Sequence, residues 1–235
     1  MRHRFQSEIE SFREGLVEMA SLTLAQVERA VAAWDETDVE AARMVMLGDE
    51  AVDERCAELD HQIFSIQVLE SPVARDQRLL HVGLIAVVAL ERVGDLAVAI
   101  AQMVTAVRPE GADPNIQKLI RRMSARAVDT LASGVQAIAR KNPALGERAA
   151  EESRVVADML DDLLSLAAAV PDDPDKREWS AAAVLVGRHL ERVANNGREL
   201  GGRVRFLVEG EPFKRAGAAP TVEQERPGVP PKQSS

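Results

Sequence analysis

The chain carries one short stretch twice, first as Leu90-Glu91-Arg92-Val93-Gly94-Asp95 and again, 100 positions later, as Leu190-Glu191-Arg192-Val193-Ala194-Asn195. Each copy lies inside a long run of apolar residues at helical spacing without proline, which predicts an α-helix. Side chains four positions apart lie on the same face of a helix. Glu91 and Asp95 therefore present two carboxylates side by side, whereas Glu191 has the neutral Asn195 as its neighbour.

The duplication extends beyond this stretch. Met19-Ala20-Ser21 is similar to Met123-Ser124-Ala125 at an offset of 104 positions, and residues 82–104 match residues 182–204 at an offset of 100. Repetition of a three-helix unit predicts two three-helix bundles in tandem.

The domain boundaries follow from this repeat. We expect the first bundle over residues 1–108 and the second over residues 112–210. Residues 211–235 are rich in Pro, Gly, Ala, Gln and Ser. Such a segment buries too little apolar surface to offset its ordering entropy, so we expect a disordered tail.

Six helices of about 30 residues are expected, and short links make successive helices antiparallel neighbours in an all-α fold. The expected ranges are 4–34, 38–70, 72–107, 114–141, 143–169 and 174–209. Four dipeptides combine a favourable N-cap residue with proline at the first helical position, namely Ser71-Pro72, Asp113-Pro114, Asn142-Pro143 and Asp173-Pro174. Thr37 and Glu40 are spaced as a capping box at the start of the second helix.

Composition excludes several classes of protein. The 235 residues carry a net charge of −9 with a pI near 5.1, which argues against nucleic acid as a partner because phosphate binding needs a basic face. The N-terminus lacks the apolar segment of a signal peptide, and the most apolar run, residues 82–90, is too short to span a membrane. Cys56 is the only cysteine, which excludes an intramolecular disulfide, and we expect it to be a buried, inert thiol. These features predict a cytoplasmic protein.

A second pair of carboxylates, Asp49 and Asp53, lies on the preceding helix. If the helices at 38–70 and 72–107 pack antiparallel, this pair can lie beside Glu91 and Asp95. Converging carboxylates repel one another, and either protonation or a bound cation relieves that repulsion. Oxygen ligands suit Mg, Ca, Mn, Fe or Zn, so the four residues are a candidate metal site. Acidic pairs at this spacing also occur on solvated helix faces, and that alternative stays open.

The second repeat keeps less of this chemistry. Glu152 takes the position of Asp49, but Val156 takes that of Asp53 and Asn195 replaces the second acid of the opening stretch. Glu152 and Glu191 therefore form at most a degenerate second site.

Three segments together resemble the PhoU family of phosphate-signalling regulators. They are the stretch at residues 90–95 with the apolar run 96–101 that follows it, residues 69–78, and residues 203–211. The resemblance covers about residues 1–211, in order and in both repeats.

The resemblance implies two three-helix bundles related by pseudo-twofold symmetry, with acidic pairs that hold iron, zinc or another divalent or trivalent cation. Carried over to this sequence, the metal-binding residues are Asp49, Asp53, Glu91 and Asp95. The second repeat departs from the family pattern at Val156 and Asn195, and the first departs at Leu96 and Ala99.

The resemblance also implies a role as a non-enzymatic adaptor. Such a protein links a phosphate ABC transporter, through its ATPase subunit, to a sensor histidine kinase and represses phosphate-starvation genes when phosphate is ample. It reaches the membrane only through these partners. A homodimer is among the assemblies that we consider.

Two other functions remain as alternatives. A di-metal carboxylate enzyme in a helical bundle uses a Glu-x-x-His pair from each of two helices, but only Glu58 and His61 have this spacing. A helical scaffold without a metal or phosphate role is the other alternative. No arrangement of serine, cysteine or histidine indicates nucleophilic catalysis, so we expect no catalytic residues and no cofactor site other than the metal site.

Overall fold

The computed structural model describes residues 2–210, in which every regular element is a helix. The elements are α1 (Arg2–Glu36), α2 (Val39–Leu47), α3 (Asp49–Glu70), α4 (Ala74–Ala106), the 3₁₀ turn η1 (Pro109–Gly111), α5 (Pro114–Arg140), α6 (Pro143–Ala168), α7 (Pro174–Gly202) and α8 (Val204–Glu209). The predicted all-α fold is therefore confirmed. The expected disordered tail, residues 211–235, lies outside the described residues. None of the helices within residues 2–210 is long and apolar enough to cross a membrane.

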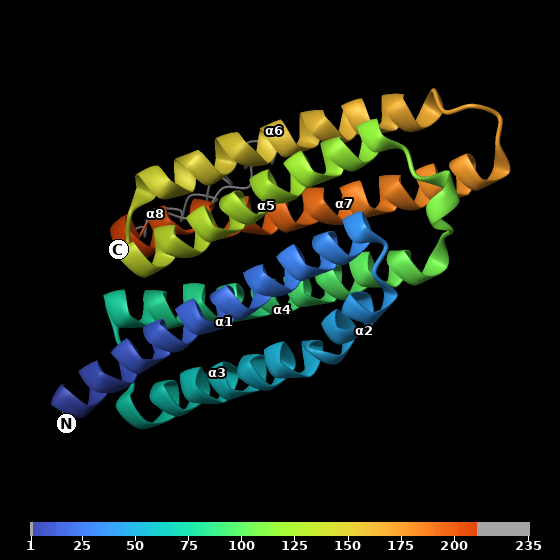
Figure 1. Cartoon of the computed structure of the whole chain (residues 1–235). Helices are drawn as coiled ribbons and strands as arrows, with labels where there is room; N and C mark the ends of the chain where they lie inside the picture. Colours follow the sequence, from blue (N-terminus) through green and yellow to red (C-terminus); the bar gives the residue numbers. More distant parts are fainter. Residues whose placement is uncertain (1, 211–235) are drawn as a thin grey trace, which may run out of the picture.

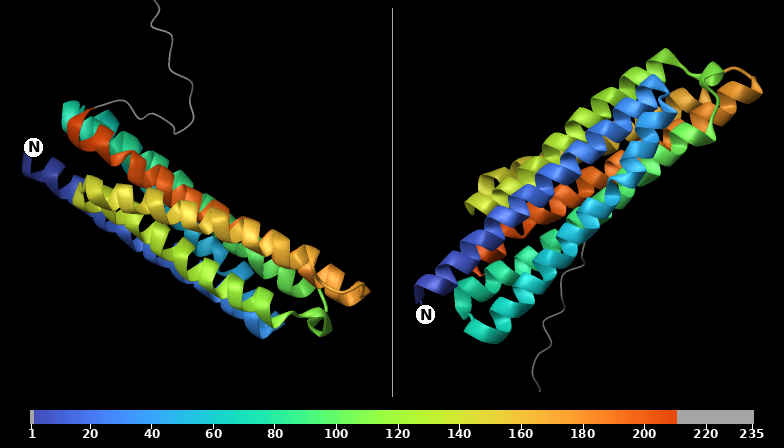
Figure 2. Two further views of the ribbon diagram at one scale, coloured as in Figure 1. Left: turned by 90° about the horizontal axis from the view of Figure 1, so that it is seen from above. Right: turned by 60° about the horizontal axis from the view of Figure 1, so that its bottom comes forward.

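The helices form two bundles, α1 to α4 and α5 to α8, which lie side by side (Figure 1). Across their interface α4 packs against α7 and α1 packs against α5, and each of these pairs is antiparallel. Figure 2 shows from two further directions that the long helices run roughly parallel to one another. Contact between each element and its own copy is the arrangement that a twofold axis produces. The predicted pseudo-twofold relation is confirmed.

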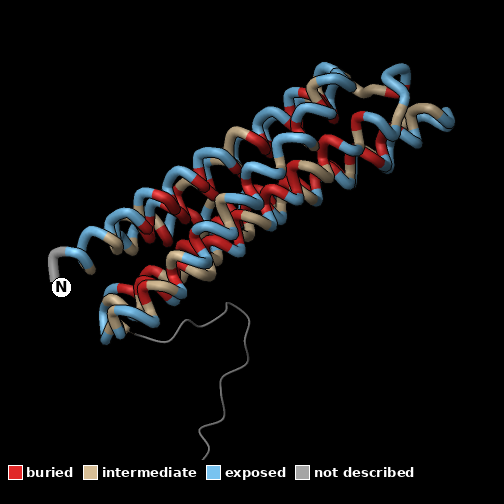
Figure 3. The backbone as a smooth tube through the Cα atoms, turned by 90° about the horizontal axis from the view of Figure 1, so that it is seen from below, coloured by how far each residue is buried: buried red, intermediate tan, exposed pale blue. Residues whose placement is uncertain are grey.

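The core follows the helical periodicity of the sequence. The buried residues of α1 include Phe12, Leu16, Met19, Thr23, Val27, Val31 and Trp34. Buried positions lie on the sides of the helices that face one another (Figure 3). Trp34 stacks on Trp179 with ring centroids 5.3 Å apart, which joins the two bundles at one end.

Three of the predicted helix starts are confirmed. Asp113, Asn142 and Asp173 each accept backbone N–H groups of the following helix, and a proline follows each of them. The caps satisfy donors that have no partner within the helix.

Two predicted N-cap residues are wrong. Asp38, not Thr37, caps α2 by accepting the backbone N–H groups of Glu40 and Ala41. Ser71 ends α3 with a φ of 45°, and α4 begins only at Ala74. A residue before proline is disfavoured in the helical region, which explains why the chain leaves the helix here.

Two predicted helices are interrupted. The range 38–70 is divided at Gly48, a residue of low helix propensity, and the range 174–209 is divided at Arg203. The first interruption has a consequence for the site, because it places Asp49 in the first turn of α3.

Candidate metal site

The structure brings together the four acidic residues of the first repeat. Asp49 and Asp53 lie on α3, Glu91 and Asp95 lie on α4, and the two helices pack against each other. Asp49 and Glu91 are partly buried, whereas Asp53 and Asp95 are exposed. A cation can therefore approach the cluster from solvent.

Burial and mutual repulsion both favour the protonated form of carboxylates in this cluster. Burial raises the pKa of Asp49, a hydrogen bond from Gln26 opposes this rise, and the Asp53 and Asp95 carboxylates add to it. Burial also raises the pKa of Glu91, and Asp95 and Asp53 raise it further. Repulsion between nearby carboxylates and loss of hydration both favour the protonated form.

Within residues 2–210, none of the four carboxylates forms an ion pair with a basic side chain. No group of three or more His, Cys, Asp or Glu side chains in this range is arranged to hold a metal ion as placed. The four residues nevertheless supply only oxygen ligands, the type that hard and borderline cations prefer.

Gln26 of α1 contacts Asp49 from the buried side of the cluster, and this contact was not expected from the sequence. Its side chain is 4% exposed, and its Nε2 donates to Asp49 Oδ1 at 2.9 Å and to the Val45 carbonyl at 3.4 Å. Its Oε1 is buried without a hydrogen-bond partner. The signal in the sequence was a polar residue seven positions after Met19 on the buried face of α1.

Gly94 makes room for Asp49. A Cβ atom at this position would lie 3.0 Å from Asp49 Oδ1 and 3.3 Å from Val52 Cγ1. The glycine of the repeated stretch therefore allows the Asp49 carboxylate to lie against α4.

The equivalent region of the second bundle is neutralised by arginines. Glu152 accepts a hydrogen bond from Arg126 at 2.6 Å, and Glu191 forms an ion pair with Arg188. Ser153 Oγ donates to Asn195 Oδ1 at 3.2 Å. The polar groups of this region therefore satisfy one another.

The two repeats align one residue differently from the expected register. The buried Val52 and Leu59 correspond to the buried Val156 and Leu163 at an offset of 104, which makes Ser153 the counterpart of Asp49. The same offset aligns Ala157 with Asp53 and Glu152 with Gly48. The expected register matched Glu152 to Asp49 by charge, whereas packing aligns the apolar faces.

The arginines of the second bundle have apolar counterparts in the first. At the same offsets Arg126 corresponds to Leu22, which is 46% exposed, and Arg188 corresponds to Val88, which is 38% exposed. The first bundle therefore lacks both basic residues that neutralise the second.

Two further residues can be placed relative to the cluster. Cys56 of α3 is partly buried, and burial raises the pKa of its thiol, as do Glu91, Asp60 and Asp53 in that order. Glu58, the acid of the single Glu-x-x-His spacing, accepts a hydrogen bond from Arg55 at 2.7 Å, and both Glu58 and His61 are exposed. This geometry does not resemble a buried di-metal centre.

The fold and the site define a class of protein: two tandem, twofold-related three-helix bundles, one of which carries unpaired carboxylates at its surface. A family model of the PhoU domain matches residues 16–104, which include most of α1 and all of α2 and α3.

Known proteins resemble the chain over most of its length. A phosphate-specific transport system accessory protein PhoU homolog from Pseudomonas putida is 26% identical over 215 residues, which are 91% of this chain and 84% of that protein. PhoU homolog 1 from Mycobacterium leprae is 29% identical over 214 residues, or 89% of this chain and 95% of that protein.

Solved structures agree with this. The crystal structure of PhoU from Pseudomonas aeruginosa superimposes with a TM-score of 0.80 at 25% identity, covering 88% of this chain and all of that one. The phosphate transport system regulatory protein PhoU from Streptococcus pneumoniae has a TM-score of 0.83 at 18% identity and shares the fold. The resemblance to the PhoU family is confirmed, and residues 16–104 match the model of the PhoU domain.

Proposed function

We propose that this chain is a non-enzymatic regulator of phosphate uptake and signalling. It couples the ATPase subunit of a phosphate ABC transporter to a sensor histidine kinase and represses phosphate-starvation genes when phosphate is ample. The observation that carries this proposal is the match of residues 16–104, which hold all four unpaired carboxylates, to the PhoU domain. Relatives named as accessory proteins of phosphate-specific transport support it across both bundles.

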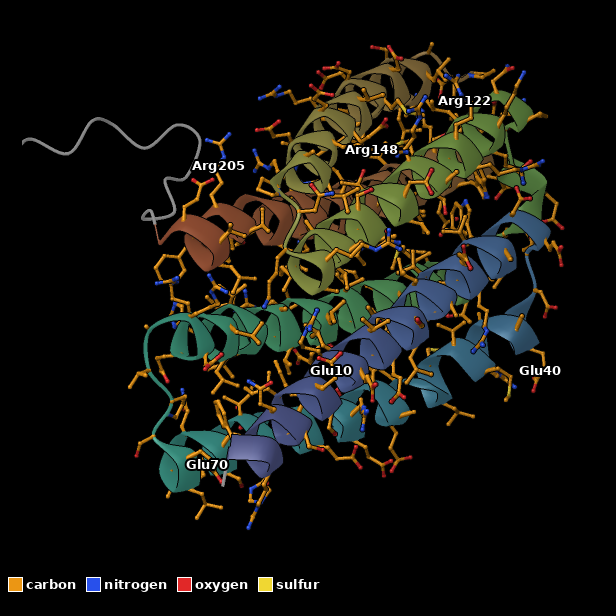
Figure 4. All side chains as sticks on the ribbon, turned by 90° about the vertical axis from the view of Figure 1, so that its left-hand side faces the viewer. Glu10, Glu40, Glu70, Arg122, Arg148 and Arg205 are labelled. Carbon is orange, nitrogen blue, oxygen red and sulfur yellow. The ribbon has the colours of Figure 1, made fainter. Side chains whose placement is uncertain are left out.

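The distribution of charge supports docking of basic partners on the first bundle. Residues 1–108 contain 19 acidic and 10 basic side chains, whereas residues 109–210 contain 16 and 15. The labelled residues of Figure 4 illustrate this difference, with Glu10, Glu40 and Glu70 on one bundle and Arg122, Arg148 and Arg205 on the other. Complementary charge steers association and fixes its orientation. In this proposal the chain is cytoplasmic, binds no nucleic acid, and reaches the membrane through these partners.

The second part of the proposal is a cation at Asp49, Asp53, Glu91 and Asp95. Repulsion keeps the unneutralised oxygens apart, and a divalent or trivalent ion such as iron or zinc would draw them together. Glu152 and Glu191 are already neutralised by ion pairs with arginines, so we propose no metal in the second bundle.

Deletion of the gene tests the regulatory role. In phosphate-rich medium the deletion strain should express phosphate-starvation genes that the parent represses, and the full chain supplied in trans should restore repression. Unchanged expression would leave the runner-up, a helical scaffold without a phosphate role. Affinity capture with the purified transporter ATPase subunit and sensor kinase separates these two functions at the level of binding.

A further inference from the structure

We infer that the C-terminal end of α3 is a docking surface for the chain's own residues 211–215, Glu-Pro-Phe-Lys-Arg, which follow directly after α8 and Gly210. The surface consists of a cluster of exposed apolar side chains and a hollow beside it. The inference goes beyond the proposed regulatory role and does not depend on a cation in the first bundle.

The end of α3 exposes a cluster of large apolar side chains, which we call the α3 tip. Phe64 and Val68 lie one turn apart on the same face of the helix, Leu69 lies in the last turn, and Val73 lies in the link to α4. Each of the four is 60–74% exposed. Single apolar side chains on a surface need no explanation, but a group of neighbouring ones marks an interaction site.

A hollow of about 350 Å³ opens beside Phe64, between α3 and α4. Aliphatic and aromatic side chains form its walls, and α3 adds one carboxylate, one imidazole and one amide. The lining residues are Asp60, His61, Ile63, Phe64, Gln67 and Leu84. Asp60 is exposed and forms no ion pair within residues 2–210. Such a hollow suits a basic side chain, because apolar walls cover its stem while a carboxylate and an aromatic ring attract its charge.

The second bundle differs at this point. The helix α6 ends at Ala168, the counterpart of Phe64 at the offset of 104 positions, whereas α3 continues to Glu70. Asp172 takes the position of Val68. The apolar α3 tip is therefore an addition to the repeated unit, and packing of the shared fold does not explain it.

The described chain ends close to this surface. In Figure 1 α8 lies at the same end of the molecule as the link between α3 and α4. Arg78 Nε of α4 donates to the Leu207 carbonyl at 3.4 Å, and a Cβ atom at Gly210 would lie 3.4 Å from Arg78 Nη1. Leu84, which lines the hollow, follows Arg78 by six positions, or about 9 Å along α4. The chain therefore leaves the fold one to two helical turns from the hollow.

The segment after Gly210 is long enough to reach the hollow. An extended chain advances about 3.3 Å per residue, so residues 211–215 span up to about 17 Å. The path to the hollow is about 9 Å along α4 and one helix diameter, about 10 Å, across it. Lys214 and Arg215 can therefore approach Asp60 while Phe213 packs on the α3 tip.

The composition of this segment complements the surface. Phe213 is the only aromatic residue after position 210, and Lys214-Arg215 is the only pair of adjacent basic residues there. Pro212 restricts the backbone before them, which lowers the entropy lost on docking. The aromatic ring matches the apolar cluster, and the two cations match the Asp60 carboxylate. A partner that binds the α3 tip must then displace residues 211–215.

Paramagnetic labelling of the full-length chain tests the inference. Cys56→Ser removes the native thiol, and Ala216→Cys then carries a nitroxide directly after the docking segment. A second variant carries the nitroxide at Ser234→Cys, further along the same part of the chain, as a control. Amide signals are compared before and after reduction of the nitroxide, and circular dichroism checks the helical content of each variant.

With the nitroxide at position 216, the signals of residues 60–68 and Leu84 should lose most of their intensity, whereas the label at position 234 should leave them largely intact. Asp60→Lys should restore these signals because it repels the two cations. Leu164→Lys is the matched control, since Leu164 is the exposed counterpart of Asp60 in the second bundle. It should leave the broadening unchanged.

Three results would overturn the inference. The first is no selective loss at the α3 tip, and the second is loss centred on the apolar groove that Met44 and Leu47 line beside α1. The third comes from mixing spin-labelled chain of natural isotope content with isotopically labelled chain that carries no nitroxide. Broadening of the α3 tip in that mixture would identify a second copy of the chain as the occupant.

Discussion

The two bundles of this protein share one architecture, and they differ in charge where α3 or its counterpart α6 faces the repeated stretch. In the first bundle four carboxylates lie on neighbouring helices and, within residues 2–210, none of them forms an ion pair; Gln26 and Gly94 lie next to Asp49. In the second bundle the two remaining carboxylates pair with Arg126 and Arg188. A helical bundle of this kind tolerates uncompensated charge at its surface, and only one copy retains it. The proposed cation site rests on this difference in charge.

The largest expected effect comes from neutralising the whole cluster. The quadruple variant Asp49→Asn, Asp53→Asn, Glu91→Gln and Asp95→Asn should reduce cation affinity more than 100-fold, since it removes every anionic ligand, while circular dichroism shows an intact helical fold. Elemental analysis and calorimetric titration with Fe²⁺, Zn²⁺ and Mn²⁺ measure the loss. The control is Glu152→Gln with Glu191→Gln, which should bind like wild type. Equal metal content in the quadruple variant would exclude the site.

A smaller effect is expected from exchanging the fifth residue of the repeated stretch, Gly94. Gly94→Ala introduces a Cβ 3.0 Å from Asp49 Oδ1, so the carboxylate must shift and Mn²⁺ affinity should fall about tenfold. The reverse change, Ala194→Gly, should destabilise the second bundle by about 1 kcal/mol through lower helix propensity and leave binding unaltered. Unchanged affinity in Gly94→Ala would show that Asp49 does not need this space.

Charge removal should change stability with opposite sign in the two bundles. Asp49→Asn keeps an acceptor for Gln26 and removes repulsion, so it should stabilise the metal-free protein by up to about 1 kcal/mol at neutral pH. Glu191→Gln breaks an ion pair with Arg188 and should destabilise by about 0.5 kcal/mol. Urea unfolding of both variants without metal measures these changes in the free energy of unfolding. A loss of stability in Asp49→Asn would contradict the electrostatic comparison.

The stabilisation by Asp49→Asn should also depend on pH. Asp49 has a higher pKa in the folded protein than in the unfolded chain, so the folded state binds more protons in the window between these two values. The free energy of unfolding of the wild type therefore falls as the pH rises through this window. The advantage of the asparagine variant should be full above the window and disappear as the pH falls below the ordinary pKa of aspartate.

The smallest expected effect concerns Cys56, the only cysteine of the chain. The reactivity of its thiol depends on the negative charge of the nearby carboxylates. Glu91→Gln removes the largest electrostatic cause of the raised thiol pKa, and alkylation by iodoacetamide at neutral pH should become about twofold faster. Mass spectrometry of the time course measures this rate. Glu152→Gln is the control and should leave the rate unchanged.

The sequence allowed most of the fold to be predicted, because apolar periodicity and N-cap residues such as Asp113 and Asp173 are local signals. It did not reveal the interruption at Gly48, since apolar residues continue at helical spacing on both sides. The four acidic residues were expected to lie near one another from their spacing on two helices that pack together. Gln26 was missed because it lies 23 positions from Asp49 on another helix, and Ser153 was missed because charge was matched before burial.

Paramagnetic line broadening tests in a single molecule whether the first bundle binds the cation and the second does not. Substoichiometric Mn²⁺ is added to isotopically labelled, metal-free protein, and amide signals are followed by NMR. We expect early loss of the signals around Asp49 and Asp95, whereas the signals around Ser153 and Asn195 should be retained. Equal loss in both bundles, loss confined to the second, or no selective loss at all would contradict it.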